Sequence, residues 1–170
     1  MRLSKGFLAV ILVLGLFCIR LAPVSSAPRV VYADAASIKS AISADKGRVV
    51  LVNFWATWCG LCVTEYPNLV KLDRIYRKKG LVIIAVSLDL HDDIGDKVVP
   101  FLVSRHASFR QFVLQQSDPE KDIDAFDPTW QGDLPRTLIY GRSGKLIDIL
   151  PDEQSFGSFQ HAVKIALRAH

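Results

Sequence analysis

The sequence predicts an α/β fold with a mixed central sheet flanked by helices, and three observations support this prediction. The runs 49–55 and 81–87 are almost entirely apolar and rich in β-branched residues, as strands buried on both faces are. A helical pattern separates them, and a strand–helix–strand unit of this length places its two strands parallel. Near the C-terminus, two short apolar runs within 137–150 flank a Gly-Arg-Ser-Gly turn, which is typical of an antiparallel hairpin.

The first half of the chain contains a strand and a helix ahead of this parallel unit. The helix between the two parallel strands stops before Gly80, a residue suited to a helix C-cap. The elements expected in this half are a strand at 30–32, a helix at 35–44, a strand at 49–55, a helix at about 61–79 and a strand at 81–87.

An inserted segment at 89–133 separates the parallel unit from the C-terminal half. We expect it to begin with a polar acidic loop and then to form a helix, a strand and a second helix. These elements are the loop at 89–96, the helix at 97–105, the strand at 109–114 and the helix at 119–126. The C-terminal half is predicted to be strand–strand–helix, at 137–140, 146–150 and about 152–169. Helices would then cover both faces of the sheet.

The first 27 residues have the composition of a secretory signal peptide. Arg2 and Lys5 precede an apolar run at 7–19, and small or polar residues follow it. The run is shorter than the roughly 20 residues that a membrane-spanning helix needs. We therefore expect 1–27 to be a signal peptide cleaved near its end, with a short N-terminal membrane anchor as the alternative. Residues 28–170 would form one domain in the periplasm.

Removal of this segment changes the charge and the cysteine count. The chain has a formal net charge of +4, with 21 basic and 17 acidic residues. The segment 1–27 holds three basic residues and no acidic one, so 18 basic residues remain against 17 acidic ones, a net charge of +1. No stripe of Lys and Arg with interleaved aromatic residues is left, which argues against a nucleic-acid partner. Cys18 leaves with the segment, and Cys59 and Cys62 remain.

These two cysteines lie in a Trp-Cys-Gly-Leu-Cys motif between a buried strand and a helix. The free N–H groups and the dipole at the helix N-terminus would stabilise a thiolate at Cys59 and lower its pKa. One helical turn brings Cys62 within bonding reach, so Cys59 would attack a target disulfide and Cys62 would resolve the mixed disulfide. The two cysteines could instead form half of a zinc site, but no second pair of Cys or His follows at ligand spacing. A purely structural disulfide would close too short a loop to stabilise the fold much.

The segment 49–67, which contains this motif, resembles the TlpA/ResA/CcmG group of exported thioredoxin-like proteins. The resemblance extends through Gly-Asp-Leu-Pro-Arg-Thr at 132–137 to Ser-Gly-Lys at 143–145. It implies a thioredoxin-like fold and a thiol–disulfide oxidoreductase without a cofactor. The implied role is reduction of disulfides in client proteins, in cytochrome c maturation or copper-site assembly, with electrons from a membrane thiol transporter.

The resemblance also assigns roles to single residues. Cys59 and Cys62 match the redox pair, and Pro135 matches a cis-proline that faces the dithiol. A cis turn there would leave the backbone of Leu134 free to pair with an extended substrate segment. Without the resemblance, a trans proline at the start of a strand would be an equal alternative. Trp58 would offer an apolar contact to substrate.

Glu65 matches an acid that this group carries near the dithiol. It lies three residues after Cys62, on the same face of the predicted helix. A carboxylate there could tune the thiol pKa and accept the proton of Cys62. The alternative is an exposed acid near the positive end of a helix. Asn53 stands where ordinary thioredoxins carry a buried aspartate, which leaves Glu65 as the nearest candidate proton carrier.

The direction of electron flow stays open at this stage. Leu61 stands where many relatives carry proline, and this residue tunes the relative stability of dithiol and disulfide. A disulfide-forming oxidant is therefore one alternative function. The other is a Cu(I)-binding module that uses Cys59 and Cys62 as soft ligands, although no further thiol or thioether remains to assist them. No resident metal site is expected, because the histidines show no ligand spacing.

Overall fold

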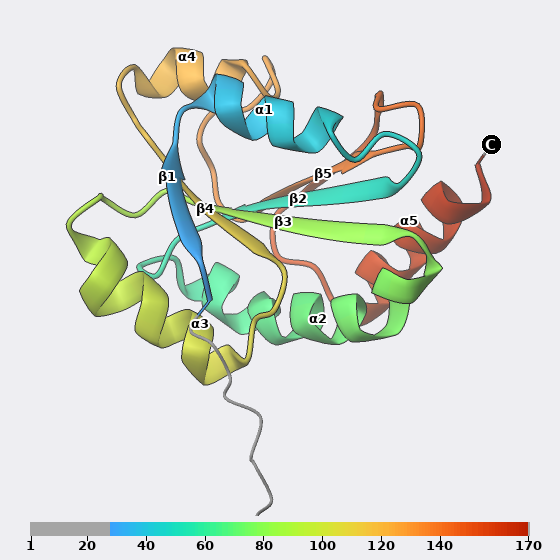
Figure 1. Ribbon diagram of the computed structural model, residues 1–170, viewed down its shortest axis with the longest axis horizontal. Helices are drawn as coiled ribbons and strands as arrows, with labels where there is room; N and C mark the ends of the chain where they lie inside the picture. Colours follow the sequence, from blue (N-terminus) through green and yellow to red (C-terminus); the bar gives the residue numbers. More distant parts are fainter. Residues whose placement is uncertain (1–27, 170) are drawn as a thin grey trace, which may run out of the picture.

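A six-stranded mixed sheet forms the centre of the domain, in the order β1-β4-β3-β2-β5-β6 (Figure 1). The computed structural model describes residues 28–169, so the expected signal peptide lies outside the described residues. The strands β1, β4, β3 and β2 are parallel to one another. The strand β5 is antiparallel to its neighbour β2, and β6 is antiparallel to its neighbour β5. The bounds are β1 Val30–Ala33, β2 Val49–Trp55, β3 Leu81–Ser87, β4 Arg110–Leu114, β5 Arg136–Tyr140 and β6 Leu146–Pro151. The predicted mixed sheet is confirmed.

Five α-helices cover the sheet on both faces, as expected. The helices α2, α3 and α5 lie on one face, and α1 and α4 lie on the other (Figure 1). Their bounds are α1 Ala35–Ser43, α2 Gly60–Tyr76, α3 Val99–Arg105, α4 Pro119–Asp124 and α5 Phe156–Arg168. Within residues 28–169, no helix combines the length and apolar character needed to span a bilayer.

The central strand β2 is buried along its whole length, and its alternating side chains supply two cores. Val49, Leu51 and Trp55 pack with α2, α3 and α5, whereas Val50, Val52 and Phe54 pack with α1. Helices cover both faces of β2, so the strand end that leads to the cysteine motif, Trp55, is fully buried.

Several helix boundaries differ from the sequence-based expectation. The helix α2 ends at Tyr76 and continues as a 3-10 turn, Arg77–Lys79, and α4 ends at Asp124, two residues early. Before α3, a π-helical turn spans Ile94–Val98, where the sequence predicted the last residues of a loop and the first residues of a helix. At the C-terminus, α5 starts at Phe156 and not near 152, because the Ser155 hydroxyl caps it by accepting a hydrogen bond from the backbone N–H of Ser158 (3.1 Å). The backbone of 152–154 is therefore free to turn, and Asp152 adopts a positive φ of 59° there.

Candidate active site

The cysteine motif lies where β2 passes into α2. Cys59 is the N-cap of α2, and its sulfur accepts a hydrogen bond from the backbone N–H of Cys62 at 3.2 Å. The two cysteines form a disulfide, with Cα atoms 5.3 Å apart. Cys59 keeps 8% of its surface exposed and Cys62 none. An incoming sulfur atom can therefore reach Cys59 first, whereas Cys62 can react only with its neighbour.

Apolar side chains are exposed beside this disulfide. Trp58 directly precedes Cys59 and is 66% exposed, and Leu61 directly precedes Cys62 and is 51% exposed. Leu90 is also exposed, and it directly follows Asp89, which accepts a hydrogen bond from the backbone N–H of Thr57 in the loop before the motif. In contrast, Trp55 is fully buried, and its ring centroid lies 4.7 Å from that of Tyr66. Exposed apolar side chains grouped around a reactive centre are typical of a surface that contacts another molecule.

Asp89 holds the loop that leads into the motif. Its carboxylate accepts hydrogen bonds from the backbone N–H of Thr57 (2.9 Å), the Thr57 hydroxyl (2.5 Å) and the Ser87 hydroxyl (2.5 Å). The sequence analysis placed Asp89 in a polar acidic loop, and it does lie in a loop after β3, but only 1% of the residue is exposed. The Ser-x-Asp spacing at the end of a buried strand was the signal that could have revealed this local turn.

Glu65 is a buried carboxyl group one turn after Cys62. Only 1% of the residue is exposed, so the alternative of an exposed helix glutamate is wrong. The carboxyl accepts hydrogen bonds from the side-chain N–H of Asn53 and the backbone N–H of Gln154, both at 2.8 Å. Burial raises the pKa of Glu65 from 4.5 to about 7, because desolvation outweighs these two bonds.

Asn53 links Glu65 to the neighbouring strand. Its amide nitrogen also lies 2.9 Å from the hydroxyl oxygen of Thr137, which is its partner in the β2–β5 register. The other amide atom, Oδ1, is buried and has no partner among the described residues. A carboxamide offers both a donor and an acceptor, so Asn53 can remain bonded to Glu65 in either protonation state.

Pro135 lies at the start of β5, beside the end of β2. The register places Arg136 opposite Phe54, so Pro135 borders the strand end from which the cysteine motif departs. The Leu134–Pro135 peptide bond is cis, and Pro135 is buried. Leu134 is partly buried and packs against both cores.

A buried ion pair anchors the loop that precedes Pro135. The Nε and one terminal nitrogen of Arg136 lie 2.9 and 2.5 Å from Oδ2 of Asp127. Burial alone would raise the pKa of Asp127, but hydrogen bonds from Thr129 and Arg136 outweigh it and hold the pKa below its ordinary value. Trp130, also in this loop, is 2% exposed and packs on Phe54, so it belongs to the core. Sequence reasoning did not find the ion pair, because Asp127 and Arg136 lie nine positions apart between the predicted helix and the predicted strand, where no periodic pattern relates them.

The residues expected at the site come from the loop after β2, the first turns of α2 and the loop before β5. The structure adds Asp89 from the loop after β3 and Gln154 from the turn before α5. Among residues 28–169, no three His, Cys, Asp or Glu side chains gather in a way that could hold a metal ion. The arrangement offers a disulfide with one accessible sulfur, a buried acid and an exposed apolar rim.

Comparison with known proteins decides the family. The family model described as Redoxin matches residues 23–147. The chain belongs to the Redoxin family. The thiol-disulfide oxidoreductase ResA of Bacillus anthracis is 30% identical over 129 residues, which cover 76% of this chain and 69% of the relative. ResA of Geobacillus kaustophilus is 39% identical over 128 residues, with 74% and 67% covered.

Solved structures agree with the Redoxin assignment at the level of the fold. A thiol:disulfide interchange protein of the thioredoxin family from Chlorobium tepidum has a TM-score of 0.62 and 23% identity, and 74% of this chain and 83% of that chain are covered. A putative thioredoxin from Neisseria meningitidis has a TM-score of 0.60 and 23% identity, with 74% and 79% covered. The protein is thus a thioredoxin-like thiol–disulfide oxidoreductase of the TlpA/ResA/CcmG-like group, as the resemblance implied.

Proposed function

We propose that this redoxin works outside the cytoplasm and reduces disulfides in client proteins. The observation that carries the proposal is Glu65, a buried acid with a pKa of about 7, one helical turn after the buried Cys62. An acid of this pKa exchanges protons readily near neutral pH, which the second step of a thiol–disulfide exchange requires. The names of the ResA relatives and the signal-like segment 1–27 support an exported oxidoreductase.

The proposed reaction begins with the reduced dithiol. The Cys59 thiolate, stabilised by the N–H groups at the start of α2, attacks one sulfur of the client disulfide. A Cys59–client bond forms, the client disulfide breaks, and the first client thiolate takes a proton from solvent.

Cys62 completes the reaction. The Glu65 carboxylate accepts the proton of the Cys62 thiol, and the resulting thiolate attacks the sulfur of Cys59. The Cys59–Cys62 disulfide forms, and the second client thiolate leaves and takes the proton that Glu65 had accepted from Cys62. The client thus gains two electrons and two protons, one from solvent and one from Cys62. We propose a membrane thiol transporter as the donor that reduces the disulfide again.

The exposed rim would hold the client during this exchange. We assign Trp58 to apolar contact with the client, and the backbone of Leu134 to pairing with an extended client segment beside Pro135. Trp58 is 66% exposed, and the strand-end position of Leu134 suits such pairing. The clients we favour are proteins of cytochrome c maturation or copper-site assembly.

The decisive experiment is capture of the client. In the Cys62→Ser variant the mixed disulfide at Cys59 cannot be resolved, so a client should remain covalently attached and be identifiable after purification from the native host. The matched Cys59→Ser variant lacks the attacking sulfur and should capture nothing by this route. Equal capture by both variants would contradict the proposed order of attack.

The redox potential tests the direction of electron flow. Equilibration with glutathione should give a value nearer the roughly −270 mV of a thioredoxin than the roughly −120 mV of a strong oxidant. A value at the oxidising end would support disulfide formation as the function. Stoichiometric Cu(I) in the purified protein, together with failure to reduce insulin, would support the copper-binding alternative.

A further inference from the structure

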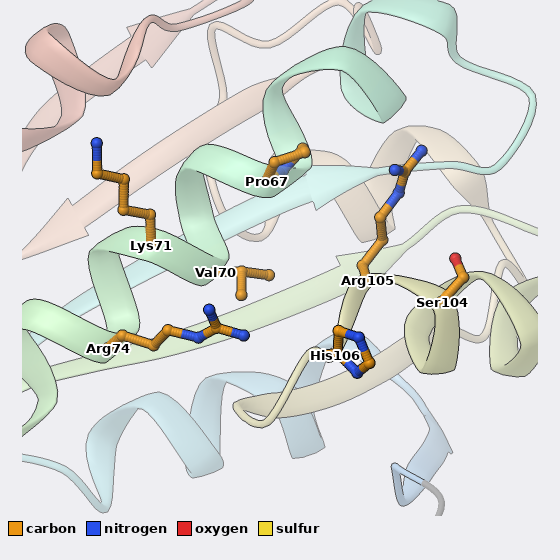
Figure 2. Close-up of a pocket in the computed structure, with 7 residues that line it drawn as sticks. All are labelled: Pro67, Val70, Lys71, Arg74, Ser104, Arg105 and His106. Atoms are coloured by element: carbon orange, nitrogen blue, oxygen red, sulfur yellow. The ribbon is translucent and has the colours of Figure 1, made fainter.

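A groove lies between the C-terminal half of α2 and the end of α3, outside the site described above. It has a volume of about 330 Å³. Pro67, Val70 and Arg74 line it from α2, and Arg105 and His106 line it from the end of α3. Figure 2 shows Arg74 projecting from α2 toward the end of α3, where His106 lies.

The groove is cationic, and its guanidinium groups have no acidic partner. No lining residue is Asp or Glu. The ion pairs among residues 28–169 include neither Arg74 nor Arg105. Asp73, the acid next to Arg74 in sequence, is bonded instead to Ser108 (3.2 Å) and lies 3.8 Å from Arg77. The remaining segment 1–27 contains no acidic residue that could serve.

Arg105 lines the groove from the other side, is partly exposed and has no ion-pair partner among the described residues. Its Nε is buried and has no hydrogen-bond partner among the described residues, while its guanidinium carbon lies 5.1 Å from the centre of the Phe101 ring. The enclosed Nε is out of reach of an incoming group, whereas the terminal nitrogens of the guanidinium are open to a carboxylate or phosphate oxygen. Lys71 contributes less to the positive charge of the groove, because its ammonium nitrogen lies over the Phe156 ring, 4.0 Å from the ring centre.

The position of the groove favours a protein as the source of the anion. The groove lies along α2, whose N-cap is Cys59. Val70 lies eleven positions after Cys59, a rise of about 16 Å at 1.5 Å per residue, which about five residues of extended chain can bridge. Whatever protein exchanges a disulfide with Cys59 can therefore reach the groove with the same segment. A flat membrane surface is less suited to a concave site between two helices.

We propose that the groove between α2 and α3 is a docking site for an acidic segment of the protein that exchanges disulfides with Cys59. The inference rests on the proposed function, because it names a feature of the partner at that same reaction. Arg74 and Arg105 would bind carboxylates of the segment, and Val70 and Pro67 would contact its aliphatic carbon atoms. The partner would thus be recognised at two points, the sulfur at Cys59 and the acidic residues in the groove.

The test compares synthetic peptides that each carry one cysteine in a mixed disulfide with 2-mercaptoethanol. One set has three Glu residues about five positions from the cysteine on either side, a second has Gln there, and a third has the Glu block next to the cysteine. The Glu peptide at the longer spacing should have a KM about three- to tenfold below that of the Gln peptide, and this preference should fade as salt is raised.

The variant R74Q/R105Q should abolish the preference for the distant Glu block. R74E provides a second variant, because Arg74 is exposed and its replacement leaves the buried part of Arg105 intact. K164Q/R168Q on α5 removes the same number of charges from exposed positions and should retain the preference. The rate at which each variant reduces bis(2-hydroxyethyl) disulfide, which is small and neutral, measures the reactivity of the Cys59–Cys62 dithiol independently of the groove.

The outcomes separate the two proposals. Failure of the wild type to reduce any disulfide would overturn the proposed function, whereas equal KM values for distant Glu and Gln peptides would overturn the docking site alone. Equal losses in R74Q/R105Q and K164Q/R168Q would also overturn it. Binding to phosphatidylglycerol vesicles that R74Q/R105Q abolishes, with unchanged peptide kinetics, would overturn it in favour of a membrane contact.

Discussion

The side-chain N–H of Asn53 donates a hydrogen bond to the carboxyl of Glu65 at 2.8 Å, inside the sheet-to-helix core. This contact joins the central strand to the first turns of the helix that carries Cys62. Both residues are buried, at 0% and 1% exposure. Desolvation raises the pKa of the buried carboxyl to about 7, and the hydrogen bonds from Gln154 and Asn53 offset only part of this rise.

The first prediction concerns the pH dependence of exchange. The Cys62 proton needs a deprotonated Glu65, so single-turnover reduction of a small disulfide should accelerate as pH rises through about 7. Glu65→Gln should remove this inflection and slow the reaction about ten- to hundredfold at pH 7.5. The difference should narrow near pH 9.5, where the thiol can lose its proton to water. Glu120→Gln, at an exposed site on α4, should behave as wild type. An inflection that persists in Glu65→Gln would assign it to another group.

The second prediction concerns stability. The folded protein raises the pKa of Glu65 above the value of 4.5 expected for an unfolded chain. The folded state therefore binds a proton between pH 4.5 and 7 that the unfolded state releases, and the free energy of unfolding falls as pH rises through this range. Relative to Glu65→Gln, the wild type should lose up to about 3 kcal/mol between pH 4.5 and 8. Urea unfolding of both oxidised proteins at the two pH values measures this. A constant difference between them would contradict the raised pKa.

The third prediction concerns the loop before the motif. Asp89→Asn removes one acceptor oxygen from a buried group that receives three hydrogen bonds from Thr57 and Ser87. We expect a loss of about 1–3 kcal/mol in the free energy of unfolding. Insulin reduction should also slow, because Thr57 lies two residues before Cys59. The control is Asp92→Asn, whose side chain is fully exposed. Equal behaviour of the two variants would show that Asp89 does not hold the loop.

The fourth prediction concerns the ion pair beside Pro135. Asp127→Ala should cost about 3–5 kcal/mol in the free energy of unfolding, because it leaves Arg136 charged and buried without its partner. Asp127→Leu combined with Arg136→Met should recover most of that loss, since no unpaired charge remains. Asp133→Ala should cost less than about 1 kcal/mol, because this carboxylate is half exposed and lies 3.7 Å from Arg136. Chemical denaturation of the three variants provides the measurement, and similar losses in all three would contradict a dominant role for Asp127.

The elements of the fold were predictable because each has a local signature. The apolar runs of β2 and β3, the turn glycines of the hairpin and the helical pattern after Cys62 all lie within short windows of sequence. Helix boundaries are predicted less well, because a single capping side chain or a contact with a distant residue decides where a helix begins or ends. Ser155, for example, starts α5 later than the helical pattern suggested.

The redox role of the two cysteines was predictable from the sequence, whereas the burial of the acidic side chains near them was not. The cysteine spacing between a strand and a helix predicted the redox pair without knowledge of contacts. Whether Glu65 is buried depends on Asn53, 12 residues away, and on Gln154, 89 residues away. The burial of Asp89 similarly depends on Thr57, 32 residues earlier. An acidic side chain has the same sequence signature in solvent and in a core, so its partners decide its state.

The sequence by itself determined the α/β class, the mixed sheet and the pair of cysteines at a helix N-terminus, because these follow from local periodicity and spacing. Only the tertiary structure decided which carboxylates are buried and how strongly their proton affinity is changed. It also decided that Arg74 and Arg105, 31 positions apart in the chain, line one groove without an acid. Desolvation and charge pairing act through space, and only the packing of distant segments brings these groups together.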